Sequence, residues 1–226
     1  MLKISNYNDL RSSMSPGDVI AFGGKGTFSE IIKWATRAPV SHVGVILQSK
    51  LFYDDKSQPG FFNQIIESTS LNGQSGVTIT RLSDRIDSYD GEIWLLPLRS
   101  DLKLKMDKKK YYDFLIHQER KPYDMPQAIK SALDLIDDAV SPGVLTHNLE
   151  DFSRFFCSEL VAAALENAGV IDHLNASEVT PIDLCSFNIY EDYYYQMKGH
   201  KIDGAADIKR VEIKGFNSLN PTGWGE

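Results

Sequence analysis

Residues 40–47 read VSHVGVIL, a β-branched run with a histidine, His42, near its beginning. A run of this length and composition is typical of a buried strand. Further stretches of strand length lie nearby, and they cover residues 18–22, 61–69, 77–80 and 92–97. Turn residues such as Ser15-Pro16-Gly17 separate them. Because consecutive strands with short links usually pair antiparallel, we predict an antiparallel sheet or barrel.

The periodicity of the sequence changes after the last of these strands. Apolar residues recur at mostly helical spacing over 102–119 and over 128–139. A third helix is predicted from Cys157 onward, with Gly169 at its C-cap. Strands first and helices later predict an α+β fold in which the sheet packs against the Cys157 helix.

The chain has 226 residues, of which 42% are hydrophobic and 24% charged. This is ordinary globular usage, so neither a disordered nor a fibrous chain is expected. We expect one domain over residues 1–197 and treat 198–226 as a C-terminal appendage of unknown order. The formal net charge of −7 disfavours nucleic acid as a partner, because polyanions are bound mainly through clustered Lys and Arg.

The first nine residues turn polar before an apolar segment of signal-peptide length develops. No apolar run approaches bilayer-spanning length either. We therefore expect a cytoplasmic protein without stable membrane insertion, although export without a signal peptide stays open. Oligomeric state is not indicated.

The two cysteines, Cys157 and Cys185, are both expected as thiols in an intracellular chain of this size. Cys157 begins an amphipathic helix, where unpaired backbone N–H groups and the helix dipole favour a thiolate. The same amides would stabilise an oxyanion. Taken alone, Cys157 is still better explained as a small core residue, and we interpret Cys185 as structural.

His42 lies inside an apolar strand, where an imidazole needs polar partners if it is buried. It would serve as a general base, or it is a core histidine with satisfied hydrogen bonds. Glu67, on the next predicted strand, could fix the tautomer of His42, or it is a surface carboxylate. No histidine pair has metal-ligand spacing with a cysteine or carboxylate, so we predict neither metal nor other cofactor.

Several short motifs occur together in a defined order. They are Pro16-Gly17-Asp18-Val19-Ile20, Ser41-His42-Val43-Gly44-Val45, Ile66-Glu67-Ser68 with Gly76-Val77, Pro122-Tyr123-Asp124 and Phe156-Cys157-Ser158-Glu159-Leu160-Val161. The ordered set resembles the circularly permuted branch of the NlpC/P60 superfamily, the YiiX/YebB-like papain-fold hydrolases. In that branch the histidine strand precedes the cysteine helix.

The resemblance implies a permuted papain-like fold and a cysteine hydrolase of the amidase or peptidase type. It assigns Cys157 as the nucleophile, His42 as the general base and later acid, and Glu67 as the residue that orients the imidazole. It places Tyr123 in the substrate cleft, where a loop aromatic packed on the core is an equally good interpretation. Ser158 and Asp124 complete the predicted substrate-binding set.

The chain departs from ordinary NlpC/P60 enzymes around the cysteine, where Phe156 and Glu159 stand in place of Asp and Gly. That Asp recognises a substrate amine, so a peptidoglycan-type peptide is only one candidate substrate. Asp124 is our suggested replacement. One alternative is a lipid acyl hydrolase, acyltransferase or lysine deacylase related to the lecithin:retinol acyltransferase-like group. The other is a binding protein with a catalytically dead cleft. The expected partner is accordingly a small peptide or an acyl amide or ester.

Overall fold

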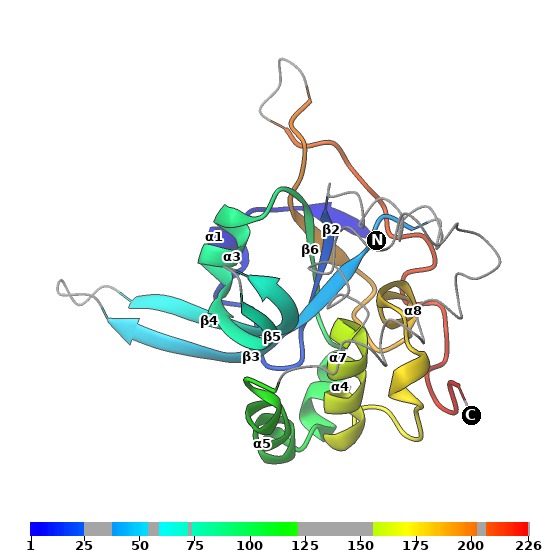
Figure 1. Cartoon of the computed structure of the whole chain (residues 1–226). Coiled ribbons are helices and arrows are strands. Elements are labelled where there is room, and N and C mark those ends of the chain that lie inside the picture. The colour runs from blue at the N-terminus through cyan, green and yellow to red at the C-terminus, as the bar shows by residue number, and fades with distance from the viewer. Residues whose placement is uncertain (25–37, 54–58, 72–73, 122–155, 203–206, 226) are drawn as a thin grey trace, which may run out of the picture.

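The computed structural model describes residues 1–24, 38–53, 59–71, 74–121, 156–202 and 207–225. Its strands are β1 (Leu2–Ile4), β2 (Val19–Gly24), β3 (His42–Tyr53), β4 (Pro59–Leu71), β5 (Gln74–Arg81), β6 (Gly91–Leu96) and β7 (Tyr194–Lys198). Its helices are α1 (Tyr7–Leu10), α3 (Leu82–Ser88), α4 (Ser100–Lys105), α5 (Lys108–Gln118), α7 (Phe156–Asn167), the 3-10 helix Ala176–Glu178 and α8 (Pro181–Ser186). The chain has a mixed α+β fold (Figure 1).

The strands form one seven-stranded sheet in the order β1-β7-β6-β2-β3-β4-β5. The pairs β2–β3, β3–β4, β4–β5, β2–β6 and β6–β7 are antiparallel, which confirms the predicted pairing of the early strands. The sheet is mixed, however, because β1 pairs with β7 in parallel. That edge joins the two ends of the chain, since Leu2 lies opposite Tyr194.

Both faces of the sheet are covered, and side chains alternate between them as the strand period requires. On one face Val19, Ala21 and Val43 belong to the first core cluster, which also contains the apolar side of α7. On the other face Ile20 and Phe22 belong to the second core cluster, together with residues of α1 and α3. Helices α1 and α3 appear together at one side of the sheet in Figure 1, and α7 with α4 and α5 at another. Any group held between these layers is shielded from water.

One helix predicted from the sequence needs correction, and another lies outside the described residues. The single helix predicted over 102–119 is two helices, α4 and α5, and Asp107 caps the second by accepting hydrogen bonds from the backbone N–H groups of Lys109 and Lys110. The C-cap residue of α4, Met106, is buried between them. The helix predicted over 128–139 lies outside the described residues.

The last described segment packs on the sheet. Ile213 is 3% exposed and belongs to the first core cluster. The indole N–H of Trp94 in β6 donates to the carbonyl of Val211 at 3.0 Å. The boundary drawn at residue 197 stays a prediction. Among the described helices, none is long and apolar enough to cross a membrane.

Candidate functional site

His42 and Glu67 form a buried pair across two neighbouring strands. His42 is the first residue of β3, and its Nε2 lies 2.6 Å from Oε2 of Glu67 in β4. Their side chains are 2% and 0% exposed. Between them stands Gly44, where a Cβ would lie 3.1 Å from the Cβ of Glu67 and 2.7 Å from Cδ1 of Ile65. The glycine therefore leaves the space that lets the carboxylate approach the imidazole.

Arg85 of α3 binds the same carboxylate from the other side. Its Nε donates to Oε1 of Glu67 at 2.7 Å, and its Nη2 donates to Oε2 at 3.3 Å. The guanidinium also lies 4.9 Å from the ring centroids of both Phe22 and Tyr89. Glu67 is thus held between a histidine and a nearly buried, forked cation, and this geometry restricts the carboxylate to one orientation.

These contacts determine the charge of Glu67. Burial by itself raises the pKa of Glu67, but the hydrogen bond from His42 and the charge of Arg85 outweigh it and lower the pKa to about 2. The carboxylate therefore stays ionised at neutral pH. An ionised partner at Nε2 fixes the tautomer and orientation of the imidazole and stabilises its protonated form.

Cys157 lies in the first turn of α7, as predicted, and is buried. Its Sγ accepts a hydrogen bond of 3.4 Å from the backbone N–H of Val43, the residue that follows His42. The N–H of Ile46 donates to the carbonyl of Asp18, just before β2, so it points toward β2. Successive N–H groups along a strand point alternately to its two neighbouring strands. The N–H of Val43, three residues earlier, therefore points toward β4. Pairing of β3 with β4 begins only at Val45 and Ile66. The sulfur therefore accepts from the Val43 N–H at a position where β4 does not yet pair with β3.

The imidazole and the sulfur both lie at the dipeptide His42-Val43, since the ring belongs to its first residue and the sulfur accepts from the N–H of its second. The His42 ring packs 5.3 Å from the ring of Phe22, which belongs to the second core cluster. Cys157 belongs to the first cluster with the rest of the buried side of α7. The site is thus located at the beginning of β3, where the β3–β4 ladder has not yet closed.

The predicted substrate-binding residues have different outcomes. Ser158 is buried, and its hydroxyl donates to the carbonyl of Val179 at 2.6 Å, which fastens α7 to the segment before α8. Its contact with substrate stays a prediction. Tyr123 and Asp124 lie outside the described residues.

Cys185 differs from Cys157 in its surroundings. It lies in α8, is buried, and is a free thiol. Burial, with additional contributions from Cys157 and Asp183, raises the pKa of the Cys185 thiol well above its usual range. A thiol that resists ionisation is a poor nucleophile, which agrees with a structural role.

No group of three or more His, Cys, Asp or Glu side chains that could hold a metal ion occurs within the described ranges. The residue that sequence reasoning missed is Arg85. It lies in a stretch that looked merely polar, 81–90, yet Leu82, Ile86 and Tyr89 recur there at helical spacing. That periodicity was the available signal for α3, although no sequence pattern indicated that Arg85 would meet Glu67.

No protein-family model and no curated protein matches the chain. Among solved structures, it is similar to the crystal structure of metalloprotein yiiX from Escherichia coli O157:H7, DUF1105, with 20% sequence identity and a TM-score of 0.40. The similarity covers 68% of this chain and 66% of that chain, so it spans just under two thirds of the solved protein.

Proposed function

We propose that the chain is a thiol hydrolase on a circularly permuted, papain-like fold of the NlpC/P60 type. The observation that supports this proposal is the hydrogen bond from the Val43 N–H to Sγ of Cys157, because Val43 directly follows His42, the partner of Glu67. A thiol at a helix start, an imidazole and a buried carboxylate on the imidazole are the parts that nucleophilic catalysis by cysteine requires. The ordered motifs of the sequence support the same assignment.

In the proposed mechanism, Nε2 of His42 is engaged by Glu67, so Nδ1 takes the proton from Sγ of Cys157. The thiolate attacks a carbonyl carbon, and backbone N–H groups at the start of α7 stabilise the oxyanion. The bond to the leaving amine or alcohol breaks as His42 returns the proton to it. Water, deprotonated by His42, then attacks the thioester, and the acid product leaves with the thiol restored.

The candidate substrates are a small peptide and an acyl amide or ester, and a peptidoglycan-type peptide is one of them. Cys157 is 0% exposed, whereas a reacting carbonyl must come within about 3.5 Å of the sulfur. The proposal therefore requires the atoms that cover the thiol to move before substrate enters. Reactivity of the thiol should be limited by this opening.

The complete burial of Cys157 also favours a second candidate, a binding protein in which the thiol and the His42–Glu67 pair only hold α7 against the sheet. The two candidates differ in how the thiol reacts. In an enzyme, His42 favours the thiolate form of Cys157, and a reagent can reach the sulfur. In a structural site, the thiol stays protonated and covered.

The test is alkylation by iodoacetamide at pH 7, followed by peptide mass spectrometry, together with hydrolysis of a panel of murein peptides and acyl amides. We expect Cys157 to be labelled faster than free cysteine, His42→Gln to slow this labelling, and Cys157→Ala to abolish hydrolysis. Cys185→Ala is the matched control and should retain both properties. Equal hydrolysis by the Cys157→Ala variant and the parent, or labelling no faster than at Cys185, would refute the enzyme assignment.

A further inference from the structure

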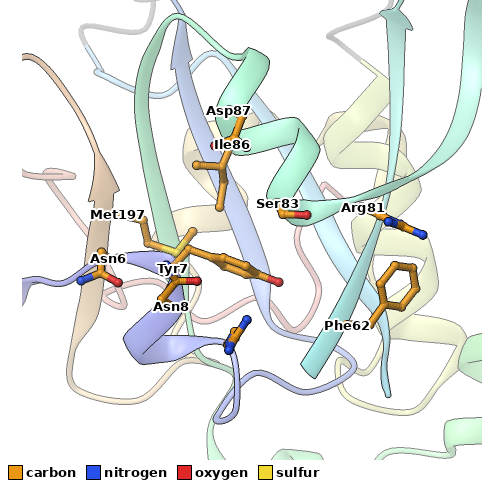
Figure 2. A pocket seen from close by; sticks show the side chains of 10 residues that line it. Asn6, Tyr7, Asn8, Phe62, Arg81, Ser83, Ile86, Asp87 and Met197 are labelled. Atoms are coloured by element: carbon orange, nitrogen blue, oxygen red, sulfur yellow. The ribbon is translucent and has the colours of Figure 1, made fainter. Parts of the chain in front are cut away.

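A pocket with a volume of about 480 Å³ lies apart from the thiol, on the side of the sheet covered by α1 and α3 (Figure 2). A volume of this size is within the range of small-molecule sites. None of Cys157, His42 and Glu67 lines it. The lining residues come from α1 and the turn after it, β4, the end of β5, α3 and β7, and are Asn6, Tyr7, Asn8, Arg11, Phe62, Arg81, Ser83, Ile86, Asp87 and Met197.

Two arginines of this lining differ from Arg85 and Arg99 in their ion pairing. Arg85 and Arg99 are each bound to a carboxylate at 2.6–2.7 Å. Throughout the part of the chain that the structure describes, Arg11 and Arg81 have no such ion pair, although acidic residues outnumber basic ones by 31 to 24. Forked guanidinium groups without carboxylate partners are suited to bind a carboxylate or phosphate of a ligand.

Flat and apolar surfaces lie beside these charges. The guanidinium of Arg81 lies 5.0 Å from the ring centroid of Phe62. Tyr7 is half-buried, and Figure 2 shows its ring projecting into the pocket between α3 and the Phe62 side. Ile86 and Met197 add apolar surface. An aromatic or similarly flat group would therefore be in contact with rings and methyl groups instead of water.

The acidic side chains restrict where a ligand's negative group can lie. Asp87 lies at a different end of the pocket from Arg81 and Phe62 (Figure 2). Asp84 accepts a hydrogen bond from the Ser83 hydroxyl at 3.0 Å. Burial raises the pKa of Tyr7, the charge of Arg11 lowers it, and the nearby charge of Asp84 adds to the rise. A second negative group near Asp87 would be repelled. The lining thus favours a ligand with one anionic end.

We propose that this pocket binds a small organic anion with a flat ring, whose carboxylate or phosphate is bound by Arg11 or Arg81 and whose ring lies against Tyr7 or Phe62. This ligand site is separate from the proposed thiol chemistry and does not depend on it. The binding energy comes from charge-assisted hydrogen bonds at one end and burial of apolar surface at the other.

The experiment titrates the full chain with benzoate, phenyl phosphate, inorganic phosphate and the uncharged benzyl alcohol, using isothermal titration calorimetry and NMR. We expect saturable binding of benzoate or phenyl phosphate in the millimolar range or tighter. At least one of Arg11→Met and Arg81→Met should weaken it about tenfold or more, because it removes the charge-assisted interaction with the anionic group. Inorganic phosphate, which lacks a ring, and benzyl alcohol, which lacks a charge, should bind more weakly than the aromatic anion that binds.

Arg120→Met is the matched control, because its guanidinium is 89% exposed at the end of α5 and does not line the pocket. It should leave binding unchanged. The proposal is overturned if neither aromatic anion binds saturably, if both pocket variants bind as the parent does, or if inorganic phosphate binds as tightly as phenyl phosphate. Thermal denaturation of each variant shows whether it is folded, and both arginines are accessible enough that we expect little change.

Discussion

At the scale of single residues, Glu67 connects His42 and Arg85 through one buried carboxylate. Its pKa is lowered from 4.5 to about 2, so the folded chain holds fewer protons than the unfolded chain in this interval. The stabilisation is complete above about pH 4.5 and is lost as pH falls toward 2. It amounts to about 3 kcal/mol, from about 1.4 kcal/mol per pKa unit.

We therefore expect the free energy of unfolding of the parent, measured by urea denaturation, to fall steeply between pH 4.5 and 2. Glu67→Gln should be less stable at pH 7, because it leaves Arg85 buried without a charged partner, and should show a flatter profile in the acid range. Parallel profiles for parent and variant would show that Glu67 does not contribute this stability.

Arg85 is the positioning residue that holds Glu67 toward His42. Arg85→Met removes one partner of a buried ion pair and should cost about 3–5 kcal/mol. Arg85→Lys keeps a charge but loses the forked contact to both carboxylate oxygens, so it should remain folded with Glu67 less well oriented. The measurement is the rate of Cys157 alkylation as a function of pH. In Arg85→Lys, the fall of this rate in acid should occur at a higher pH than in the parent, because Arg85 lowers the pKa of Glu67.

Arg81→Met provides the comparison for this experiment. Arg81 lies only four positions away at the end of β5, but its contact is with Phe62 and not with Glu67. Its alkylation profile should match that of the parent. If Arg85→Lys also matches the parent, Arg85 stabilises the fold without influencing the thiol.

At the scale of elements, the approach of β3 to β4 at Gly44 decides whether the His42–Glu67 pair can form. A Cβ at this position would lie 2.7 Å from Cδ1 of Ile65, closer than real Cβ contacts allow. We expect Gly44→Ala to destabilise the fold by about 1–3 kcal/mol, as overpacking of a core does. Thermal or urea denaturation measures the loss.

A second substitution tests the cause of that loss. Ile65→Val removes Cδ1, so the double variant Gly44→Ala with Ile65→Val should recover part of the stability and show a favourable coupling energy. Strict additivity of the two substitutions would exclude this contact as the origin of the effect.

The same elements show what the sequence could and could not predict. The strand at 40–47 and the helix from Cys157 were predictable, because periodicity and β-branched composition act locally. The break between α4 and α5 was missed because Met106 fits the helical spacing, while the decisive signal is the capping side chain of Asp107. Pairing of β1 with β7 joins residues nearly the whole chain apart, and no local pattern encodes it.

The same limit applies to the candidate site. Cys157 and His42 could be singled out by their positions in a helix start and an apolar strand. The hydrogen bond from Val43 to the sulfur depends on where the β3–β4 ladder begins, and that is set by packing of the whole sheet. Arg85 could not have been assigned, because its role follows from α3 packing on β4 and β5.

At the scale of the whole molecule, the last described segment contacts buried side chains of β7. The amide of Gln196, which is fully buried in β7, donates to the carbonyl of Lys209 and accepts from the N–H of Val211. The hydroxyl of Tyr194 accepts from the N–H of Ile213 at 2.9 Å. Removing residues 203–226 would leave buried polar groups of the sheet without these partners, and each such group costs about 1–3 kcal/mol.

We therefore expect a chain of residues 1–202 to melt at a markedly lower temperature than the parent. Ile213→Ala should cost about 2–5 kcal/mol, because Ile213 is 3% exposed and its truncation leaves a cavity in the first core cluster. Ile202→Ala is the matched control, since that side chain is 50% exposed and should change stability by less than about 0.5 kcal/mol. If the truncated chain and Ile213→Ala both melt with the parent, residues 198–226 are an appendage, as the sequence predicted. Otherwise the segment is part of the single fold, because it supplies hydrogen-bond partners to buried side chains of β7.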